Sequence, residues 1–249
     1  ASYDQHVDKI SGGLGVLLTN DKAGEGTLGT TTFSGIYSYQ VNITRKFSVR
    51  AGFQGTFVQK KVDWEKLTFG DMIDPRQGFI FTTSEQKNLV SRSYPDISAG
   101  ILGFSKKYYF GFAAHHLTQP DEGFLGASKL PLKLTGHAGA VIPLNGKAGD
   151  AAISPNILYR KQQDFQQFNL GLYITKGPIV VGFWYRNKDS FIALLGLQQG
   201  IFKIGYSYDV TISKLTNANT AGSHEVSAQM LFKCKPKKKK LRTLSCPSF

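Results

Sequence analysis

The stretch Ile201–Phe232 has the sequence IFKIGYSYDVTISKLTNANTAGSHEVSAQMLF, in which two segments alternate between apolar and polar residues. The apolar positions are Phe202, Ile204, Tyr206 and Tyr208 in the first segment, and Val226, Ala228, Met230 and Phe232 in the second. Side chains of a β-strand point alternately to opposite faces. The stretch therefore predicts a hairpin of two strands, each with one apolar and one polar face. The fold depends on which solvent wets each face.

The same period of two recurs along the rest of the chain. It is clearest at Phe47–Phe57, where Phe and Val alternate with Ser, Arg and Gln, as is typical of a strand with two different surroundings. A sustained helical period does not stand out, so the sequence predicts an all-β chain. We expect strands at 1–6, 13–19, 31–44, 47–57, 94–104, 108–116, 132–144, 151–161, 166–175, 179–186, 191–197, 201–212 and 225–232.

Composition leaves two interpretations of this alternation open. No stretch reaches the roughly 18 consecutive apolar residues of a transmembrane helix, but the strands of a membrane barrel are only half apolar and escape that criterion. The strands therefore belong either to a membrane barrel with apolar faces toward lipid, or to a soluble barrel or sandwich with those faces inward. With 18 Phe and 11 Tyr, the soluble form would have to fill its interior with many large aromatic side chains.

The lengths of the connections favour the membrane barrel. Counted back from the C-terminus, alternate connections fall on two sides, and every long one (20–30, 60–93, 117–130 and 213–222) falls on the same side. The other side has only short turns, such as Arg45-Lys46 and Ser105-Lys106. Outer-membrane barrels have long extracellular loops and short periplasmic turns. The predicted fold class is therefore an all-β transmembrane antiparallel β-barrel.

The strand count sets the predicted domain organisation. About 13 strands are visible, and because bacterial single-chain barrels usually have an even number, we expect about 14 in the full protein. The first strand or strands would then precede residue 1, and the hairpin Ile201–Phe232 would end the barrel beside a strand that this chain does not contain. Residues 1–233 form the predicted outer-membrane barrel, and residues 234–249 form a basic periplasmic tail.

Charged residues at the polar positions of the strands are expected to line the lumen of the barrel. These are Arg50, Arg160, Arg186, Lys203, Asp209 and Glu225. Such residues either form internal ion pairs that brace the barrel or line a conduit. We expect paired charges that plug the lumen rather than an open pore.

The tail is the strongest candidate for a binding site. The chain has a net charge of +13 from 30 basic and 17 acidic residues, which suggests an acidic partner. The candidate tail residues are Lys235, Lys237, Lys238, Lys239, Lys240 and Arg242. Cys234 and Cys246 are a candidate disulfide that would close the tail into a loop, although two unpaired thiols fit the sequence equally well. A solvated basic tail and a nucleic-acid-binding tail are the alternatives.

The predicted extracellular loops contain a second set of candidate partner-binding residues. These are Asp21, Lys22, Trp64, Asp71, Asp74, His116 and Gln119. His115 and His116 would face opposite ways at the end of a strand, and neither they nor the two cysteines have the spacing of a metal site. We therefore expect no catalytic residues, metal or cofactor.

Several motifs together resemble the PorP/SprF family of outer-membrane proteins, part of the type IX secretion and gliding machinery of Bacteroidetes. They are NDKAGEG, TTTFSGIYSYQV, GFAAHHLTQP, ISPNILYRKQQDFQQFNLGLYI, VGFWYRNKDSFIALLG and IGYSYDVTISKLTNANTAGSHEVS. The resemblance runs from about Gly12 to Phe232, and it is specific because the motifs occur together in order.

The resemblance implies a non-enzymatic outer-membrane β-barrel that supports export or cell-surface anchoring of secreted, adhesin-like type IX substrates. The implied partners are such a substrate and other periplasmic or outer-membrane secretion components, including peptidoglycan-associated ones. Membrane lipid and lipopolysaccharide would contact the apolar faces, and nucleic acid would not be a partner. A passive outer-membrane channel and a soluble basic β protein that binds nucleic acid are the alternative functions.

Overall fold

The computed structural model describes residues 1–24, 27–85, 90–124, 126–144, 151–212 and 222–232. In these ranges the first strands are β1 (Ser2–Val7), β2 (Gly12–Ala23), β3 (Leu28–Asn42), β4 (Ser48–Val62), β5 (Ile73–Asp74), β6 (Gly78–Phe79), β7 (Ser91–Phe104) and β8 (Tyr108–His115). They are followed by β9 (Lys133–Ala140), β10 (Ile142–Pro143), β11 (Ala151–Gln162), β12 (Phe165–Lys176), β13 (Ile179–Arg186), β14 (Ser190–Gln199), β15 (Phe202–Thr211) and β16 (Ser223–Met230). The described helices are single 3-10 turns, η1 (Asp8–Ile10), η2 (Trp64–Lys66) and η3 (Gly70–Met72).

The strands form a meander. The order in the 14-stranded sheet follows the sequence from β1 to β16, except that β10 pairs only with β11 and β5 and β6 form a separate small hairpin. Every pairing with a described register is antiparallel. The predicted all-β antiparallel fold and its strand count are therefore confirmed.

The chain divides into two compact units, each of which is described by itself. Unit 1 comprises Ala1–Tyr39, Ala51–Ala99 and Ala114–Leu132. Unit 2 comprises Gln40–Arg50, Gly100–Ala113 and Lys133–Phe249. The boundaries fall inside strands, so β3, β4, β7 and β8 each contribute residues to both units.

In unit 1 the hairpin of β2 and β3 is longer than the sequence predicted. The ladder continues to the pair Ala23 and Leu28, so the connection predicted at 20–30 shrinks to residues 24–27. Polar cross-strand contacts support this extension, because Asn20 Nδ2 donates to Thr31 Oγ1 at 2.8 Å. By composition, the polar residues of this stretch predict a loop, whereas in the structure they pair across two exposed strands.

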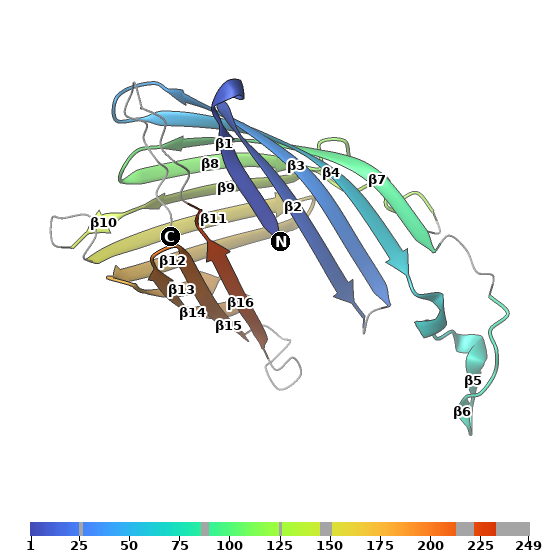
Figure 1. The fold of residues 1–249 in the computed structure, drawn as a ribbon. Coiled ribbons are helices and arrows are strands. Elements are labelled where there is room, and N and C mark those ends of the chain that lie inside the picture. The colour runs from blue at the N-terminus through green and yellow to red at the C-terminus, as the bar shows by residue number, and fades with distance from the viewer. Residues whose placement is uncertain (25–26, 86–89, 125, 145–150, 213–221, 233–249) are drawn as a thin grey trace. The chain divides into compact units, whose positions relative to one another are not determined.

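In unit 2 the closing hairpin has the predicted form. β15 pairs with β16 from Phe202 opposite Met230 to Asp209 opposite Ser223, and Figure 1 shows β11 to β16 as successive neighbouring strands. One predicted strand, 132–144, is instead divided into β9 and β10. The remaining strands of this unit match their predicted ranges to within a few residues at each end.

The two faces of the strands differ in exposure, and the apolar face is the exposed one. Ile204 is 55% exposed and Leu195 is 59% exposed, whereas Asn156 and Asn169 on the opposite face are 5% and 7% exposed. A water-soluble β protein would bury its large apolar side chains and expose its amides. This distribution is the one expected of strands that face lipid, which decides between the two interpretations of the alternation.

Within the described ranges, no helix is both long enough and apolar enough to span a membrane.

Candidate functional site

The connection after β8, residues 116–132, folds back onto the polar face of unit 1 and forms a cluster of charged contacts there. We call this segment the β8–β9 loop. Its Leu117 N–H donates to the Ile97 carbonyl of β7 at 2.9 Å, which turns the chain back toward the strand it has just left. Three acidic or basic side chains of β4 and β7 then hold the loop. We call the contacts of each of these side chains with the loop an anchor.

The first anchor is the carboxylate of Asp96, which is 5% exposed. Its Oδ2 lies 2.8 Å from His116 Nδ1, and its Oδ1 accepts a hydrogen bond from Thr118 Oγ1 at 3.0 Å. A buried carboxylate is tolerated only where partners replace its water. His116 has a φ of 60°, so the chain bends sharply at the residue that makes this contact.

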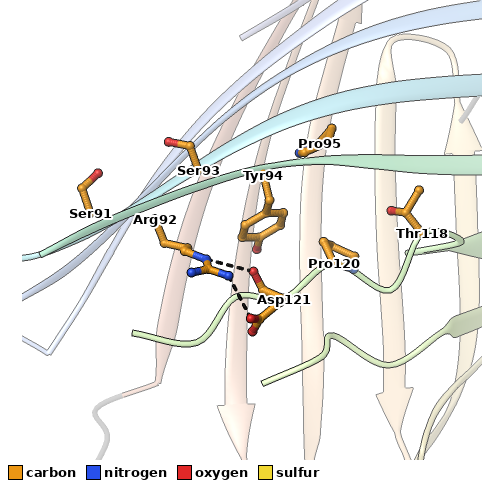
Figure 2. Close-up of a pocket in the computed structure, with 8 residues that line it drawn as sticks. All are labelled: Ser91, Arg92, Ser93, Tyr94, Pro95, Thr118, Pro120 and Asp121. Carbon is orange, nitrogen blue, oxygen red and sulfur yellow. Dashed lines mark hydrogen bonds and ion pairs between the residues drawn. The ribbon is translucent and has the colours of Figure 1, made fainter. Parts of the chain in front are cut away.

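The second anchor joins Arg92 of β7 to Asp121 of the loop (Figure 2). Arg92 Nη2 donates to Asp121 Oδ2 at 2.8 Å, and Arg92 Nε donates to the Asp121 carbonyl at 3.2 Å. The other carboxylate oxygen of Asp121 accepts the backbone N–H groups of Ser128 at 2.8 Å and Gly123 at 3.1 Å. These backbone hydrogen bonds, with that of Ser128 foremost, lower the pKa of Asp121 below its ordinary value.

The third anchor reaches the next strand. Lys60 of β4 forms an ion pair with Glu122 Oε2, and the Tyr94 hydroxyl of β7 donates to the same oxygen at 3.2 Å. Both charged side chains are about three-quarters buried, with 22% and 24% exposed. Glu122 therefore ties the β8–β9 loop across two strands at once.

A shallow hollow of about 590 Å³ lies between β7 and the loop. Its lining residues are Ser91, Arg92, Ser93, Tyr94, Pro95, Thr118, Pro120 and Asp121. Figure 2 shows Arg92 and Asp121 meeting across it. The charges that line it are matched to each other, so the arrangement is suited to holding the loop in place rather than to acid–base chemistry. Over the described residues, no group of three or more His, Cys, Asp or Glu could hold a metal ion.

The connection between β4 and β7 uses its predicted site residues to build its own fold. Asp71 accepts hydrogen bonds from the Ser84 N–H at 2.7 Å and from the Thr83 hydroxyl at 3.0 Å, and the Ser84 bond is the main cause of its lowered pKa. Asp74 Oδ1 accepts the backbone N–H groups of residues 76 and 77. Trp64 packs against Phe69 with ring centroids 5.2 Å apart.

The structure corrects two loop assignments. Asp21 and Lys22 lie in β2, opposite Thr30 and Gly29, and not in a loop. Two further candidate loop residues, His116 and Gln119, lie at the start of the β8–β9 loop. Both have a left-handed backbone, with a φ of 42° at Gln119.

The candidate lumen residues lie on the strands as the alternation predicted, and three of them, Arg50, Arg186 and Asp209, have local side-chain contacts. Arg186 Nη1 lies 3.0 Å from Asp189 and 3.3 Å from Asp209. Arg50 donates to Gln40 at 2.7 Å, and its guanidinium carbon lies 5.5 Å from the centre of the Phe104 ring. Arg160 and Lys203 are half-buried, whereas Glu225 is exposed on β16. Their position in a lumen stays a prediction.

The predicted tail site lies outside the described residues. This holds for Lys235, Lys237, Lys238, Lys239, Lys240 and Arg242, and for the candidate disulfide Cys234–Cys246.

A 14-stranded antiparallel sheet with its large apolar side chains outward defines an integral β protein of the outer membrane. The family model described as type IX secretion system membrane protein PorP/SprF matches residues 1–230. The chain therefore belongs to the PorP/SprF family and is a membrane component of the type IX secretion system, which implies interaction with other components of that machinery.

Two further comparisons add context. The chain is similar to a solved structure of a FadL homologue from Pseudomonas aeruginosa, with 15% sequence identity, a TM-score of 0.46, and coverage of 88% of this chain and 72% of that one. No curated protein sequence matches the chain.

Proposed function

We propose that the chain is a non-enzymatic β-barrel that supports export or cell-surface anchoring of adhesin-like type IX substrates. The family supports a role in secretion. The observation that carries the rest is the β8–β9 loop, which lies across the polar strand face and is held there by Lys60, Arg92 and Asp96. A segment pinned in this way occupies the face that a passive channel would leave to water, so it favours a partner or anchor over an open pore.

Closure of the sheet follows from the proposed setting. In hydrocarbon, each unpaired backbone N–H or C=O group is costly, so a sheet that spans a membrane closes into a barrel. The exposed apolar faces would then contact lipid and lipopolysaccharide. The candidate lumen residues would then line the interior.

The tail and the extracellular side are proposed to contact different partners. The six basic tail residues carry a local positive charge suited to an acidic periplasmic component, including a peptidoglycan-associated one. A Cys234–Cys246 disulfide would compact this tail. The substrate would meet the opposite side, where the connections 63–90 and 116–132 carry Trp64, Asp71, Asp74, His116 and Gln119.

Gene deletion with complementation tests the proposal. We expect the deletion strain to lose one or a few large proteins from its surface and culture medium, and plasmid-borne wild-type protein to restore them, as measured by mass spectrometry of both fractions. An unchanged surface and secreted proteome would contradict the proposal.

The passive channel is the second candidate, because half-buried Arg50, Arg160 and Lys203 on the polar face could attract anions. Planar-bilayer recordings separate the two functions. Porin-like conductance by the purified wild-type protein would favour the channel, and a closed protein that co-purifies with a secreted substrate would favour the anchor.

A further inference from the structure

The polar face of unit 2 contains a hollow of about 300 Å³ that the β8–β9 loop does not use. Its lining residues are Leu158, Asn169, Tyr173, Trp184, Ile192, Leu194, Gly205, Tyr206, Ser207, Glu225 and Ser227. They come from β11 to β16. Several are large apolar side chains on a face where the alternation predicts small or polar residues. This departure from the pattern is the reason to ask what the hollow receives.

Two aromatic rings form a fixed wall of the hollow because glycines opposite them leave room. Trp184 pairs with Gly171, and Gly182 pairs with Tyr173. A Cβ added to Gly171 would lie 2.4 Å from the Trp184 ring, and one added to Gly182 would lie 2.6 Å from the Tyr173 ring. Each ring therefore lies over a glycine of the neighbouring strand, and the two rings meet edge to face with centroids 5.9 Å apart.

The polar atoms at the hollow include two acceptors that lack a donor. Asn169, 7% exposed, has a buried Oδ1 atom without a hydrogen-bond partner. The Glu225 carboxylate has no ion pair among the residues that the structure describes. A buried acceptor without a partner is costly, and the Nε–H of Arg186, which lies opposite Asn169 in the ladder, is likewise buried without a partner. Glu225 is exposed, so its carboxylate is the acceptor that a ligand in the hollow can reach.

The charges around the hollow leave Glu225 uncompensated on its own strand pair. Arg186, which is paired with Asn169 in the ladder, is already contacted by the carboxylates of Asp189 and Asp209. Lys203 lies opposite Gln229, and Glu225 lies opposite Ser207. The Glu225 carboxylate is therefore the group at the hollow with which a positively charged ligand would pair.

We propose that this hollow binds a basic side chain, arginine or lysine, of an extended peptide. The apolar stem of such a side chain would pack on Leu158, Ile192 and Leu194. Its cationic group would lie against the Trp184 ring and donate to Glu225. The assignment of this peptide to an exported or anchored substrate rests on the function proposed above. The binding chemistry of the hollow is independent of that function.

The chain offers a built-in reporter for the test. Its two tryptophans are Trp64 and Trp184, so Trp64→Phe leaves Trp184 as the single fluorophore. The full-length variant in lipid nanodiscs is titrated with acetyl-Gly-Leu-Arg-Leu-Gly-amide, and with matched peptides that carry Leu or Glu in place of Arg. We expect saturable change of Trp184 emission with the Arg peptide and none with the Glu peptide.

Two variants test the assigned contacts. Glu225→Gln should weaken binding of the Arg peptide about tenfold, the effect expected when a hydrogen bond to a charged group is lost. The control Glu85→Gln makes the same charge change in the β4–β7 connection and should leave the affinity unchanged. Gly171→Ala should displace the Trp184 ring and weaken binding of the Arg peptide, with correct folding checked by heat-dependent gel mobility.

The outcomes separate this inference from the proposed function. Equal binding of the Leu and Arg peptides, or an unchanged affinity of Glu225→Gln, would overturn the basic-side-chain site while leaving the secretion role intact. Selective binding in a protein whose deletion does not alter secretion would keep the site and overturn the proposed source of the peptide.

Discussion

The polar faces of the two units are completed in different ways. In unit 1, a loop crosses the face and is held by ion pairs to Lys60 and Arg92 and by hydrogen bonds to Asp96. In unit 2, the strands themselves supply the contacts on this face, through the Arg186–Asp209 pair between β13 and β15 and through aromatic rings that lie over glycines of the adjacent strand. The first solution depends on contacts between residues as far as 62 positions apart. The second depends on cross-strand pairs.

This difference predicts where single substitutions act. A change at an anchor of unit 1 should free a whole loop and leave the strands intact. A change at a ring or glycine of unit 2 should disturb the sheet itself. The following predictions test that division.

The largest effect is expected from Asp96→Ala. It removes two hydrogen bonds to a buried carboxylate, from His116 and Thr118, and each such bond to a charged group contributes about 1.5–3 kcal/mol. Protease cleavage within 116–132 of the protein in nanodiscs should therefore rise about 100-fold. Asp209→Ala is the matched control, because Arg186 keeps Asp189. If the loop stayed resistant in Asp96→Ala, this anchor would not be what holds it.

Gly171→Ala should have the next largest effect. The added Cβ lies 2.4 Å from the Trp184 ring, and overpacking of this kind costs about 1–3 kcal/mol. The measurement is the urea midpoint of unfolding in detergent micelles or lipid vesicles. Gly136→Ala in β9 is the control, since a Cβ there meets nothing within 4 Å. Equal midpoints for the two variants would mean that the ring does not depend on this glycine.

Much of the fold could be predicted from the sequence, and the reason is local. Alternation in Phe47–Phe57 or Ile201–Phe232 records which face each side chain occupies, and a meander pairs neighbours in sequence. The prediction is wrong where it depends on composition rather than on alternation. Composition assigns Asp21 and Lys22 to a loop because they are polar, but they lie in β2 and pair with β3.

The candidate site was only partly predictable. His116 was expected to be a site residue, but its partner Asp96 was not, nor were Lys60, Arg92 and Glu122. Each of these looks like an ordinary polar position of a strand or loop, and only the fold brings them together. The acidic pair Asp121 and Glu122, which follows Pro120, was the one available sign that the loop would seek basic partners.

A smaller effect is expected from Arg92→Gln combined with Lys60→Met. Both ion pairs are partly exposed, at 33% and 36% for Arg92 and Asp121, so their loss should cost the loop only about 1 kcal/mol each. We expect brief openings in single-channel recordings of the double variant that the wild-type protein lacks. Arg186→Gln, which changes a charge in unit 2, should not produce them. Identical traces for the double variant and the wild type would show that the loop does not limit conduction.

The smallest effect concerns pH. It tests whether contacts within the β8–β9 loop or the contact with β7 set the protonation state of Asp121. Because the folded pKa of Asp121 is lowered from 3.8, its carboxylate stabilises the loop above that pH, and the contribution is lost as pH falls through the lower folded value. Side-chain carbonyl NMR of Asp121 should therefore give a pKa below 3.8.

Arg92→Gln sharpens this prediction. The backbone N–H groups of Ser128 and Gly123 lower the pKa more than Arg92 does, so the variant should retain most of the lowering. Retention would mean that the turn at 121–128 organises its own carboxylate and then docks on β7 as a preformed unit. A return to the ordinary value would instead mean that β7 organises the carboxylate, as β13 and β15 bring Arg186 and Asp209 together in unit 2.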